Sequence, residues 1–308
     1  MNAFKFLSGR ASAGASLFTL SCLALGILVG TSGCAECTEN DAGGVTCKSL
    51  KYVQASEPKV SRVNYQPGGS LDVSTVNGKI TIVNGSEDTI VVETTPRTGK
   101  AHDTPDEEFT ATLTDLNGRT QVSGDDFGNA VVRAPGGGVD SVAVIVRLPS
   151  GFNGTIKLNQ GNGATQVDGV QGATALDIFS DNGSCQIRGA TSITSTRVHC
   201  DNGGVEVTGV ADGVDILAGN GDLFVEVQSP GGAGGTITAE NGDIDLAVPE
   251  AASFSVQATA GEAVDFGNPQ SCGVQEAAVN SKTLTCGAGG ANYVVTAQGS
   301  GASVRVSY

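Results

Sequence analysis

The chain has 308 residues, with 17 Lys and Arg against 32 Asp and Glu, and a formal net charge of −15. This acidic balance excludes a nucleic-acid-binding protein, which needs clustered basic residues to neutralise phosphate. The 45 glycines, about twice the usual share, indicate a turn-rich all-β protein outside the cytosol. With two His and no Trp, little material remains for catalysis at neutral pH or for zinc sites.

The first 33 residues have the pattern of an export signal. Lys5 and Arg10 are its only charged residues, and the stretch 11–29 is small or apolar, as in a charged n-region followed by an apolar h-region. Residues 30–33 are small and lead into Cys34. This ending resembles the lipobox of bacterial lipoproteins, although Thr31 stands where Leu is commoner. The resemblance implies cleavage before Cys34 and diacylglycerol on its thiol. The alternatives are an ordinary cleaved signal and a transmembrane anchor, because the apolar run nearly suffices to span a bilayer.

Lipidation at Cys34 predicts an exported protein of the cell envelope that is attached to a membrane through its N-terminal lipid anchor. Each acyl CH₂ buried in the bilayer contributes about 0.8 kcal/mol, and more than one chain makes the attachment stable. Ala35 follows the lipidated cysteine, without the Asp that often signals inner-membrane retention in enteric bacteria. We therefore expect the outer membrane.

Six further cysteines remain after the signal and the lipidated residue are set aside. An exported chain meets an oxidising environment, in which disulfides are expected. Fifteen connectivities are possible, and pairing of sequence neighbours closes the smallest loops, each contributing about 3 kcal/mol in the chain-entropy model. The predicted disulfides are Cys37–Cys47, Cys185–Cys200 and Cys272–Cys286. The first would close a tether over residues 34–51.

The segment after the tether begins with an alternating unit. Residues 71–82 alternate between apolar and polar around Asn77-Gly78, and Asn-Gly marks a tight corner because both residues tolerate positive φ. The polar stretch 95–108 is expected to be a loop that opens a short helix at Thr104-Pro105. Residues 142–149 then predict a strand that ends at Pro149.

From residue 158 onward the chain repeats itself. The interval between successive Asn-Gly pairs is 20, 20, 18 and 21 residues, and Ala260-Gly261 marks a degenerate sixth copy. Apolar residues recur four before each Asn, and two and four after each Gly, which is period-two alternation on both sides of a corner. The pairs are Asn162-Gly163, Asn182-Gly183, Asn202-Gly203, Asn220-Gly221 and Asn241-Gly242.

Successive hairpins or a solenoid would both give this pattern. Each column keeps its character through five copies, which favours a parallel β-helix-like solenoid whose equivalent residues stack at about 4.8 Å. Cys185 and Cys200 would then point inward from neighbouring coils. In the last copy Ala263 and Asp265 stand where aliphatics belong, as in a capping repeat. We expect one solenoid domain over 52–266 and disulfide-containing C-terminal cap strands over 267–308.

The strand into Leu148-Pro149-Ser150-Gly151, followed by Asn-Gly units, resembles the bacterial putative-adhesin family of β-solenoid domains. The best matches are the units 219–223 and 240–246, with the unit at Asn77-Gly78 as the opening coil, and the resemblance covers about residues 70–266. It implies a fold and no catalytic residues. The additional cysteines and the C-terminal extension depart from the family pattern.

Sites for chemistry are few. Along the outward rows Asp168 is expected beside Arg188, an ion pair of about 0–1 kcal/mol if exposed, and no carboxylate groove of a polysaccharide lyase is evident. Asp222, Asp243 and Asp245 flank turns and could suggest a calcium site, but the tandem pattern of calcium β-rolls is missing. The better explanation is that acidic residues stand there because they suit the turns at the corners, which is called corner chemistry below. The sequence predicts no catalytic residues, no cofactor and no metal site.

The sequence therefore favours a surface-anchored, non-catalytic protein that binds a cell-surface macromolecule or a polysaccharide through its long side. Two alternatives stay open. One is a structural envelope scaffold that assembles through unpaired coil edges. The other is a polysaccharide-active β-helix enzyme.

Overall fold

The computed structural model describes residues 36–39, 45–191, 193–210, 213–228, 232–249, 252–267, 269, 272–288 and 290–308. The export signal and Cys34 lie outside these residues, so their predictions stay predictions. A short hairpin of β1 (Glu36–Glu39) and β2 (Val45–Lys48) comes first and sets Cys37 opposite Cys47 in the antiparallel register. The side chains of this hairpin are outside the described part.

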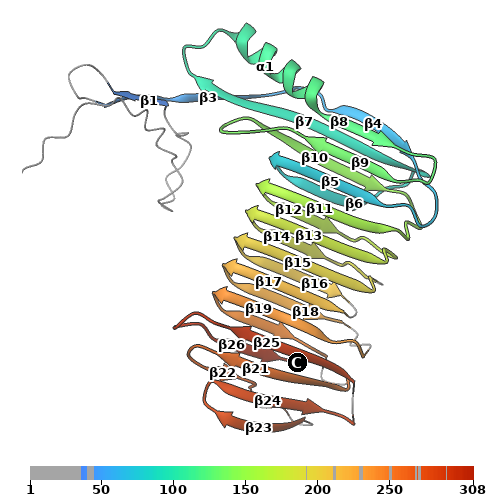
Figure 1. The fold of residues 1–308 in the computed structure, drawn as a ribbon, viewed down its shortest axis with the longest axis vertical. Helices are drawn as coiled ribbons and strands as arrows, with labels where there is room; N and C mark the ends of the chain where they lie inside the picture. The colour runs from blue at the N-terminus through green and yellow to red at the C-terminus, as the bar shows by residue number, and fades with distance from the viewer. Residues whose placement is uncertain are drawn as a thin grey trace, which may run out of the picture.

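Two sheets of twelve strands each run the length of an elongated domain (Figure 1). Sheet I contains, in spatial order, β22 (Val264–Asp265), β26 (Val304–Ser307), β20 (Ile244–Ala247), β18 (Leu223–Val227), β16 (Val205–Val210), β14 (Cys185–Arg188), β12 (Thr165–Asp168), β6 (Ile80–Asn84), β10 (Ser141–Leu148), β7 (Thr89–Ala101) and β3 (Leu50–Gln54), with β4 (Lys59–Asn64) also paired to β7. Sheet II contains, in the same direction, β23 (Cys272–Ala278), β24 (Ser281–Cys286), β21 (Phe254–Ala260), β25 (Ala291–Ala297), β19 (Gly235–Asn241), β17 (Val214–Asn220), β15 (Ser195–Asn202), β13 (Ala175–Asn182), β11 (Thr155–Asn162), β5 (Leu71–Asn77), β9 (Ala130–Ala134) and β8 (Gln121–Gly124).

Each repeat is one coil, with a long strand in sheet II, an Asn-Gly corner and a short strand in sheet I. The strands of neighbouring coils pair in parallel, with Asn182 beside Asn162 on one side and Asn202 on the other. Hairpins would pair antiparallel strands within one repeat, so the solenoid interpretation is confirmed. The chain is an all-β solenoid of Asn-Gly coils.

The corner is built from two stacked columns. Each corner Asn donates its Nδ2–H to the Oδ1 of the Asn in the preceding coil, through five bonds of 2.8–3.2 Å from Asn77 to Asn241. The following Gly has a positive φ, 142° at Gly183, and a Cβ there would lie 1.7 Å from the carbonyl oxygen of Gly163. Both the conformation and the close approach exclude any residue with a side chain.

The interior is filled by the aliphatic columns that the alternation predicted. The residues four before each Asn, and two and four after each Gly, are buried in all five repeats. Next to the corner the two sheets converge, and the buried column there is small in the later coils: Ser180, Cys200, Ala218 and Ala239. Burying each Val, Ile or Leu side chain contributes about 1.5–3 kcal/mol, so the stack of columns supplies most of the driving force for folding.

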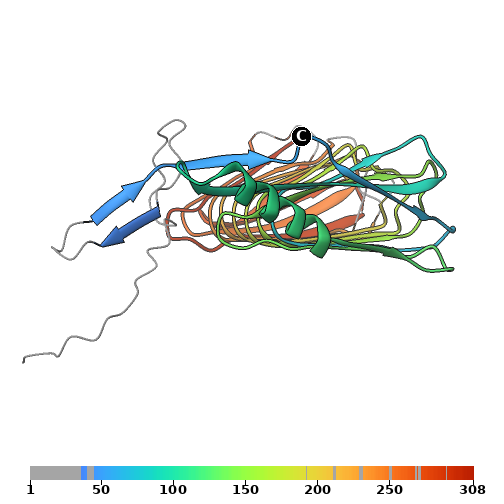
Figure 2. The same cartoon turned by 90° about the horizontal axis from the view of Figure 1, so that it is seen from above.

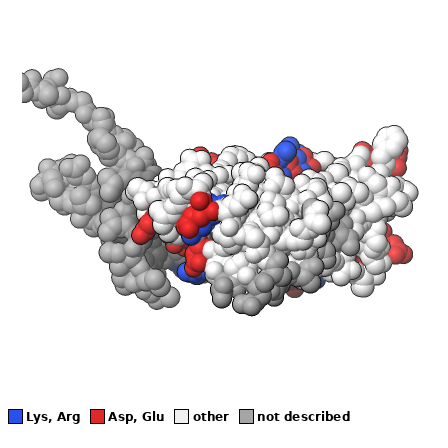
Figure 3. Space-filling view, turned by 90° about the horizontal axis from the view of Figure 1, so that it is seen from below, with Lys and Arg blue, Asp and Glu red and all other residues white. Residues whose placement is uncertain are grey.

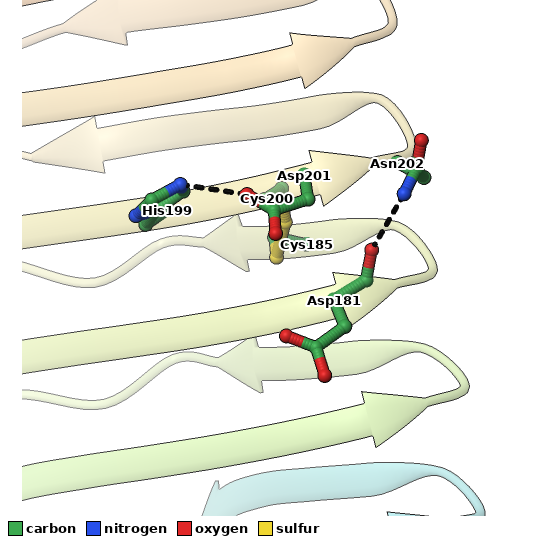
Figure 4. The surroundings of a disulfide bond; sticks show 6 residues. All are labelled: Asp181, Cys185, His199, Cys200, Asp201 and Asn202. Atoms are coloured by element: carbon green, nitrogen blue, oxygen red, sulfur yellow. Dashed lines mark hydrogen bonds and ion pairs between the residues drawn. A yellow bond between two sulfur atoms is a disulfide. The ribbon is translucent and has the colours of Figure 1, made fainter.

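A disulfide joins the two sheets inside this narrow part. Cys185 points inward from β14 in sheet I. Cys200 points inward from β15, the sheet II strand of the next coil, and both cysteines are buried (Figure 4). A second disulfide joins Cys272 and Cys286, which lie opposite each other in the β23–β24 hairpin. This hairpin pairs through β24 with β21 at the C-terminal end of the stack.

The C-terminal end departs from the expected order. Strands β25 and β26 insert between the coil β19–β20 and the coil β21–β22, pairing in parallel with both. Of residues 267–308, only the β23–β24 hairpin therefore lies beyond the last coil. The assignment of Ala263 and Asp265 to the inward positions was also wrong, because the shorter corner after Ala260 places Val264 and Phe266 in the core.

At the N-terminal end, too, a coil lies between two coils that are not its neighbours on both sides in the sequence. The first coil, β5–β6, lies between β9–β10 and β11–β12, since the chain leaves through β7 and returns through β9 and β10. The helix α1 (Asp106–Arg119) begins directly after Pro105, where a helix was expected, and packs on β7 through Phe109 and Leu116. The strand β7 runs to Ala101 and so replaces the first part of the expected loop. Figure 2 shows α1 lying across this end. Among the described residues no helix has the length and hydropathy to span a membrane.

Removal of one whole repeat should leave the fold intact. Deletion of residues 183–202 joins Asn182 to Gly203, restores every column and removes both Cys185 and Cys200. The expected loss of unfolding free energy is one coil interface plus about 3 kcal/mol for the disulfide. Deletion of residues 183–192 should prevent folding, because it places a corner beside strands. Circular dichroism and denaturant titration of the two variants test this, and equal damage from both would contradict the solenoid.

Candidate binding face

An open groove lies on the outer face of sheet I, over the middle of the solenoid. Outward positions alternate with buried ones in β14, β16, β18 and β20, and the parallel register stacks Gln186, Glu206, Phe224 and Asp245 in one column. The groove has a volume of about 280 Å³. Its lining residues are Ser184, Gln186, Gly204, Val205, Glu206, Asp222, Leu223, Phe224 and Asp245.

The wall of the groove is held by an ion pair with a neighbouring amide. Arg188 approaches Glu206 with two nitrogens, at 2.8 and 2.9 Å, and Gln186 Nε2 donates to the same carboxylate at 3.1 Å. The bonds from Arg188 lower the pKa of Glu206, with a smaller contribution from Gln186. The pKa of Arg188 is raised in turn, chiefly by its hydrogen bonds to Glu206. Two-point contact fixes the orientation of both side chains.

This ion pair corrects the expected pairing of Asp168 with Arg188. The two residues are direct neighbours in the register of β12 and β14, but Arg188 extends toward Glu206 on the opposite side. Asp168 instead accepts a hydrogen bond from Gln166 Nε2. Arg188 Nε and Nη2 bond separate oxygens of Glu206, which is the two-point geometry that a guanidinium favours with a carboxylate, and Asp168 adds only a smaller electrostatic contribution.

Phe224 is the apolar element of the groove. Its side chain is 41% exposed between the carboxylates of Asp222 and Asp245, and Asp245 lies 3.5 Å from Arg305. An exposed aromatic ring beside acidic groups offers a face for stacking and acceptors for polar hydrogens. The groove therefore suits a ligand with donor groups on an apolar ring or chain.

The acidic corner residues are used within the fold. Asp222 Oδ1 accepts the backbone N–H of Asp243 at 3.0 Å, and Asp243 Oδ1 accepts the N–H of Ser303 at 2.7 Å. Each carboxylate thus joins one coil to the next. No group of three or more potential metal ligands occurs in the part of the chain that the structure describes. These bonds agree with corner chemistry as the reason for acids at this position.

The outer face of sheet II is charged. Its register stacks Asp72, Lys157, Asp177, Arg197 and Asp215 in a column of alternating sign, within which Arg197 lies 3.3 Å from Asp215. The alternation of sign is visible in the sequence at the repeat interval, although the only outward row used for prediction was that of Asp168 and Arg188. Within this column like charges do not adjoin, so the column stabilises the coil stacking.

His199 also lies on the outer face of sheet II. Phe179 meets its ring edge-on at a centroid distance of 5.0 Å, and its Nε2 lies 2.7 Å from an Asp201 oxygen. The adjacent Cys200 points to the interior and is held in the disulfide (Figure 4). Because neighbouring strand residues face opposite sides, His199 and Cys200 do not form a pair.

The chain belongs to the Toastrack DUF4097 family, which it matches over residues 68–298. This confirms the resemblance to a putative-adhesin domain. No curated protein matches the chain.

Solved structures that match the chain include three bacterial proteins. A putative cell adhesion protein from Clostridium sporogenes is 13% identical, covers 82% of this chain and 99% of its own, and has a TM-score of 0.37. A putative adhesin from Bacteroides fragilis is also 13% identical, with coverages of 82% and 98% and a TM-score of 0.36. A putative lipid binding protein from Parabacteroides distasonis is 9% identical, with coverages of 82% and 98% and a TM-score of 0.25.

Loss of the Arg188 guanidinium should raise the pKa of Glu206. In Arg188→Met the carboxyl group keeps only the Gln186 amide, so its pKa moves up toward the ordinary value for Glu. The stabilisation from this pair is present above the unfolded-state pKa and lost as the pH falls through the folded-state pKa. NMR titration of the Glu206 carboxyl carbon measures the change. Arg197→Met, on the opposite sheet, is the control and should leave Glu206 unchanged; a similar rise in both variants would contradict the assigned pair.

Proposed function

We propose that this protein is an exported lipoprotein, anchored through Cys34, that binds a cell-surface macromolecule or polysaccharide through the groove on sheet I and does not catalyse a reaction. The observation that carries the binding role is Phe224, held 41% exposed in an open groove on a rigid stack of coils. The anchor rests on the lipobox-like ending of the export signal.

The shape of the molecule supports presentation at a surface. The repeats from Asn162 to Asn241 make a rod whose coils follow one another at about 4.8 Å, and the groove lies on its side. A single shallow groove gives weak binding, but many copies anchored in one membrane act together through avidity. A lipid anchor and a stiff spacer both serve that arrangement.

The charges of the described residues support a binding role over catalysis. A general acid near neutral pH needs a carboxyl group with a raised pKa. The carboxyl groups with a shifted pKa among the described residues are all lowered, by Arg62 at Glu87, Lys51 at Asp106, Asn129 at Asp125 and Arg188 at Glu206. Each carboxylate serves an ion pair or a turn, which disfavours a polysaccharide-active enzyme.

The two ends of the solenoid decide whether it could assemble end to end as an envelope scaffold. The C-terminal end is mostly uncharged (Figure 3), and Val274 and Val279 are exposed there on or next to the outermost strand, β23. The other end is covered by α1, whose Asp106 bonds Lys51 at 2.7 Å. Head-to-tail filaments need two complementary open ends. A single open end allows at most a symmetric dimer through that end, not a filament. A protein that binds through the side of the solenoid is therefore favoured over a scaffold.

Removal of the lipid attachment site should release the protein from membranes. Cys34→Ser leaves the folded domain unchanged, because residue 34 precedes every described strand, but it removes the thiol that carries the acyl chains. The variant should move from the membrane to the soluble fraction in cell fractionation. Mass spectrometry of the wild-type N-terminal peptide should show acyl groups. An unmodified N-terminus, together with unchanged fractionation, would overturn the anchor.

The two sheets can be compared with matched aromatic substitutions. Phe224 on sheet I and Phe179 on sheet II are 41% and 39% exposed, so each change to Ala should have a similarly small effect on the melting temperature. Multivalent beads carrying the mature domain should lose binding to envelope polysaccharide of the producing cells in Phe224→Ala, by about tenfold or more, as for an aromatic anchor residue. Phe179→Ala should bind normally. Loss in Phe179→Ala alone would move the site to sheet II, and loss in neither would contradict a binding role for both aromatic faces.

A further inference from the structure

The six corner Asn-Gly pairs share one local sequence but differ in their hydrogen bonds. In five of them the Gly N–H donates to the carbonyl oxygen of the Asn in the next coil, at 2.8–2.9 Å. The donors are Gly78, Gly163, Gly183, Gly203 and Gly221. Gly242 follows the last Asn of the ladder, and among the described residues its N–H has no such acceptor.

The side chains of the corner Asn residues form a ladder of Asn–Asn hydrogen bonds, and Asn241 is its last member. The side chain of Asn241 is therefore bonded to an Asn of the ladder on one side only. Its Nδ2 donates to Asn220 Oδ1 at 3.2 Å, as in the inner rungs. Each inner Asn also accepts a bond from the next Asn, for example Asn202 Oδ1 from Asn220 at 3.0 Å. The inserted coil β25–β26 places Gly299 beside Asn241, with the position of a Gly299 Cβ 3.5 Å from the Asn241 Cα. Among the residues that the structure describes, no side chain continues the row of Asn–Asn hydrogen bonds there.

We propose that Asn241 is a site of spontaneous covalent modification, through conversion to aspartate and isoaspartate, and that the ladder protects the five inner pairs. The Gly242 nitrogen loses its proton to solvent base and attacks Asn241 Cγ. The new C–N bond closes a five-membered succinimide as the Cγ–Nδ2 bond breaks, and the departing NH₂ group takes up one proton, equal to the one lost by Gly242, and leaves as ammonia. Water then opens either carbonyl of the ring, giving Asp or isoAsp, with one water consumed and one ammonia released.

Both hydrogen bonds oppose this reaction in the inner pairs. A Gly N–H that donates to a carbonyl is hard to deprotonate, because the resulting nitrogen anion would face an acceptor oxygen. A carboxamide held between two neighbours is also hindered from turning its Cγ toward its own backbone. Solvent exposure does not separate the sites, since Asn162, Asn202, Asn220 and Asn241 are all exposed.

Asn-Gly pairs outside the corner are restrained in other ways. Gly85 donates its N–H to Leu148 O at 2.6 Å, and Gly118 lies within α1, where N–H groups bond to the preceding turn. Asn153 Oδ1 accepts from Tyr65 Oη at 2.6 Å and from Gly68 N at 2.7 Å. Asn241 is therefore expected to react first among the described pairs.

The site lies where added charge matters for the solenoid. Conversion replaces the Nδ2 donor of Asn241 by a carboxylate oxygen, which then faces Asn220 Oδ1 across the last rung. Isoaspartate also lengthens the backbone by one bond at the corner, where the Gly242 Cβ position already lies 2.3 Å from the Gly221 carbonyl oxygen. The modified form should therefore loosen the junction with the inserted β25–β26 coil before any other coil.

The experiment is incubation of the folded mature domain at mildly alkaline pH, followed by proteolysis and mass spectrometry of peptides that separate the sites. We expect Asn241 to convert about fivefold or more faster than Asn182, as for the loss of about one net hydrogen bond. The same incubation in denaturant is the control and should make the rates similar. Equal rates in the folded protein, or an inner pair ahead of Asn241, would overturn the proposal.

A second variant tests the missing rung. Gly299 has no positive φ, and a Cβ there meets only ordinary contacts at 3.4–3.5 Å, so Gly299→Asn should fold and extend the ladder by one amide. The added side chain should donate to Asn241 Oδ1 and slow conversion several-fold. Gly299→Ala is the matched control without an amide and should leave the rate near that of the wild type. Equal conversion in both variants would overturn the role assigned to the side-chain ladder.

Discussion

The corner between the two sheets leaves no room for a Cβ, and the rest of the solenoid depends on that constraint. Carbonyl groups of successive corner glycines stack so closely that a Cβ on Gly163, Gly183 or Gly203 would lie within 2.4 Å of the preceding Gly oxygen. The close stacking brings the Gly N–H of one coil within hydrogen-bond distance of the Asn carbonyl of the next. The spacing and register of the strands are thereby fixed at one edge, and the columns of both sheets follow from it.

The tight corner also determines the composition of the interior beside it. Two sheets that meet at a turn of few residues converge, and in the later coils small residues fill the column beside the corner: Cys200, Ala218 and Ala239. Gln160 in the first repeat is the buried exception, and its side-chain amide bonds the Gly78 carbonyl oxygen. The convergence brings Cys185 of sheet I within bonding distance of Cys200 of sheet II, so the disulfide links two successive coils beside the corner.

The local features could be predicted from the sequence because each is repeated. Asn-Gly at a fixed interval marked the corners, and uniform columns distinguished a solenoid from hairpins. The order of strands at the ends could not be predicted, because it depends on pairing between segments far apart in the chain: β25 pairs with β19 and β21 although neither precedes it directly. The partner of Arg188 was also misassigned, since the register places Asp168 directly beside Arg188 and Glu206 beside Gln186, and only side-chain geometry shows that Arg188 reaches diagonally to Glu206. The sequence named Gln186, Glu206 and Phe224 as outward residues whose substitution should reduce binding, but it could not show that residues of four strands form one groove there, because that depends on the strand register.

Every open solenoid has an edge at each end, and the out-of-order strands move the first coil and the last-formed coil away from those edges. A terminal coil would pair on one side only and would fray, and its edge would invite pairing with another chain. Here the first coil, β5–β6, and the coil formed last in the sequence, β25–β26, each have a paired neighbour on both sides. Their stability makes the middle of the rod stiff, and on that stiff frame the inward columns are uniformly aliphatic while the outward column varies from Gln186 to Glu206, Phe224 and Asp245. Stacking constrains the inward side of each strand and leaves the outward side free to vary, so the chemistry of the outer face can change without altering the coil.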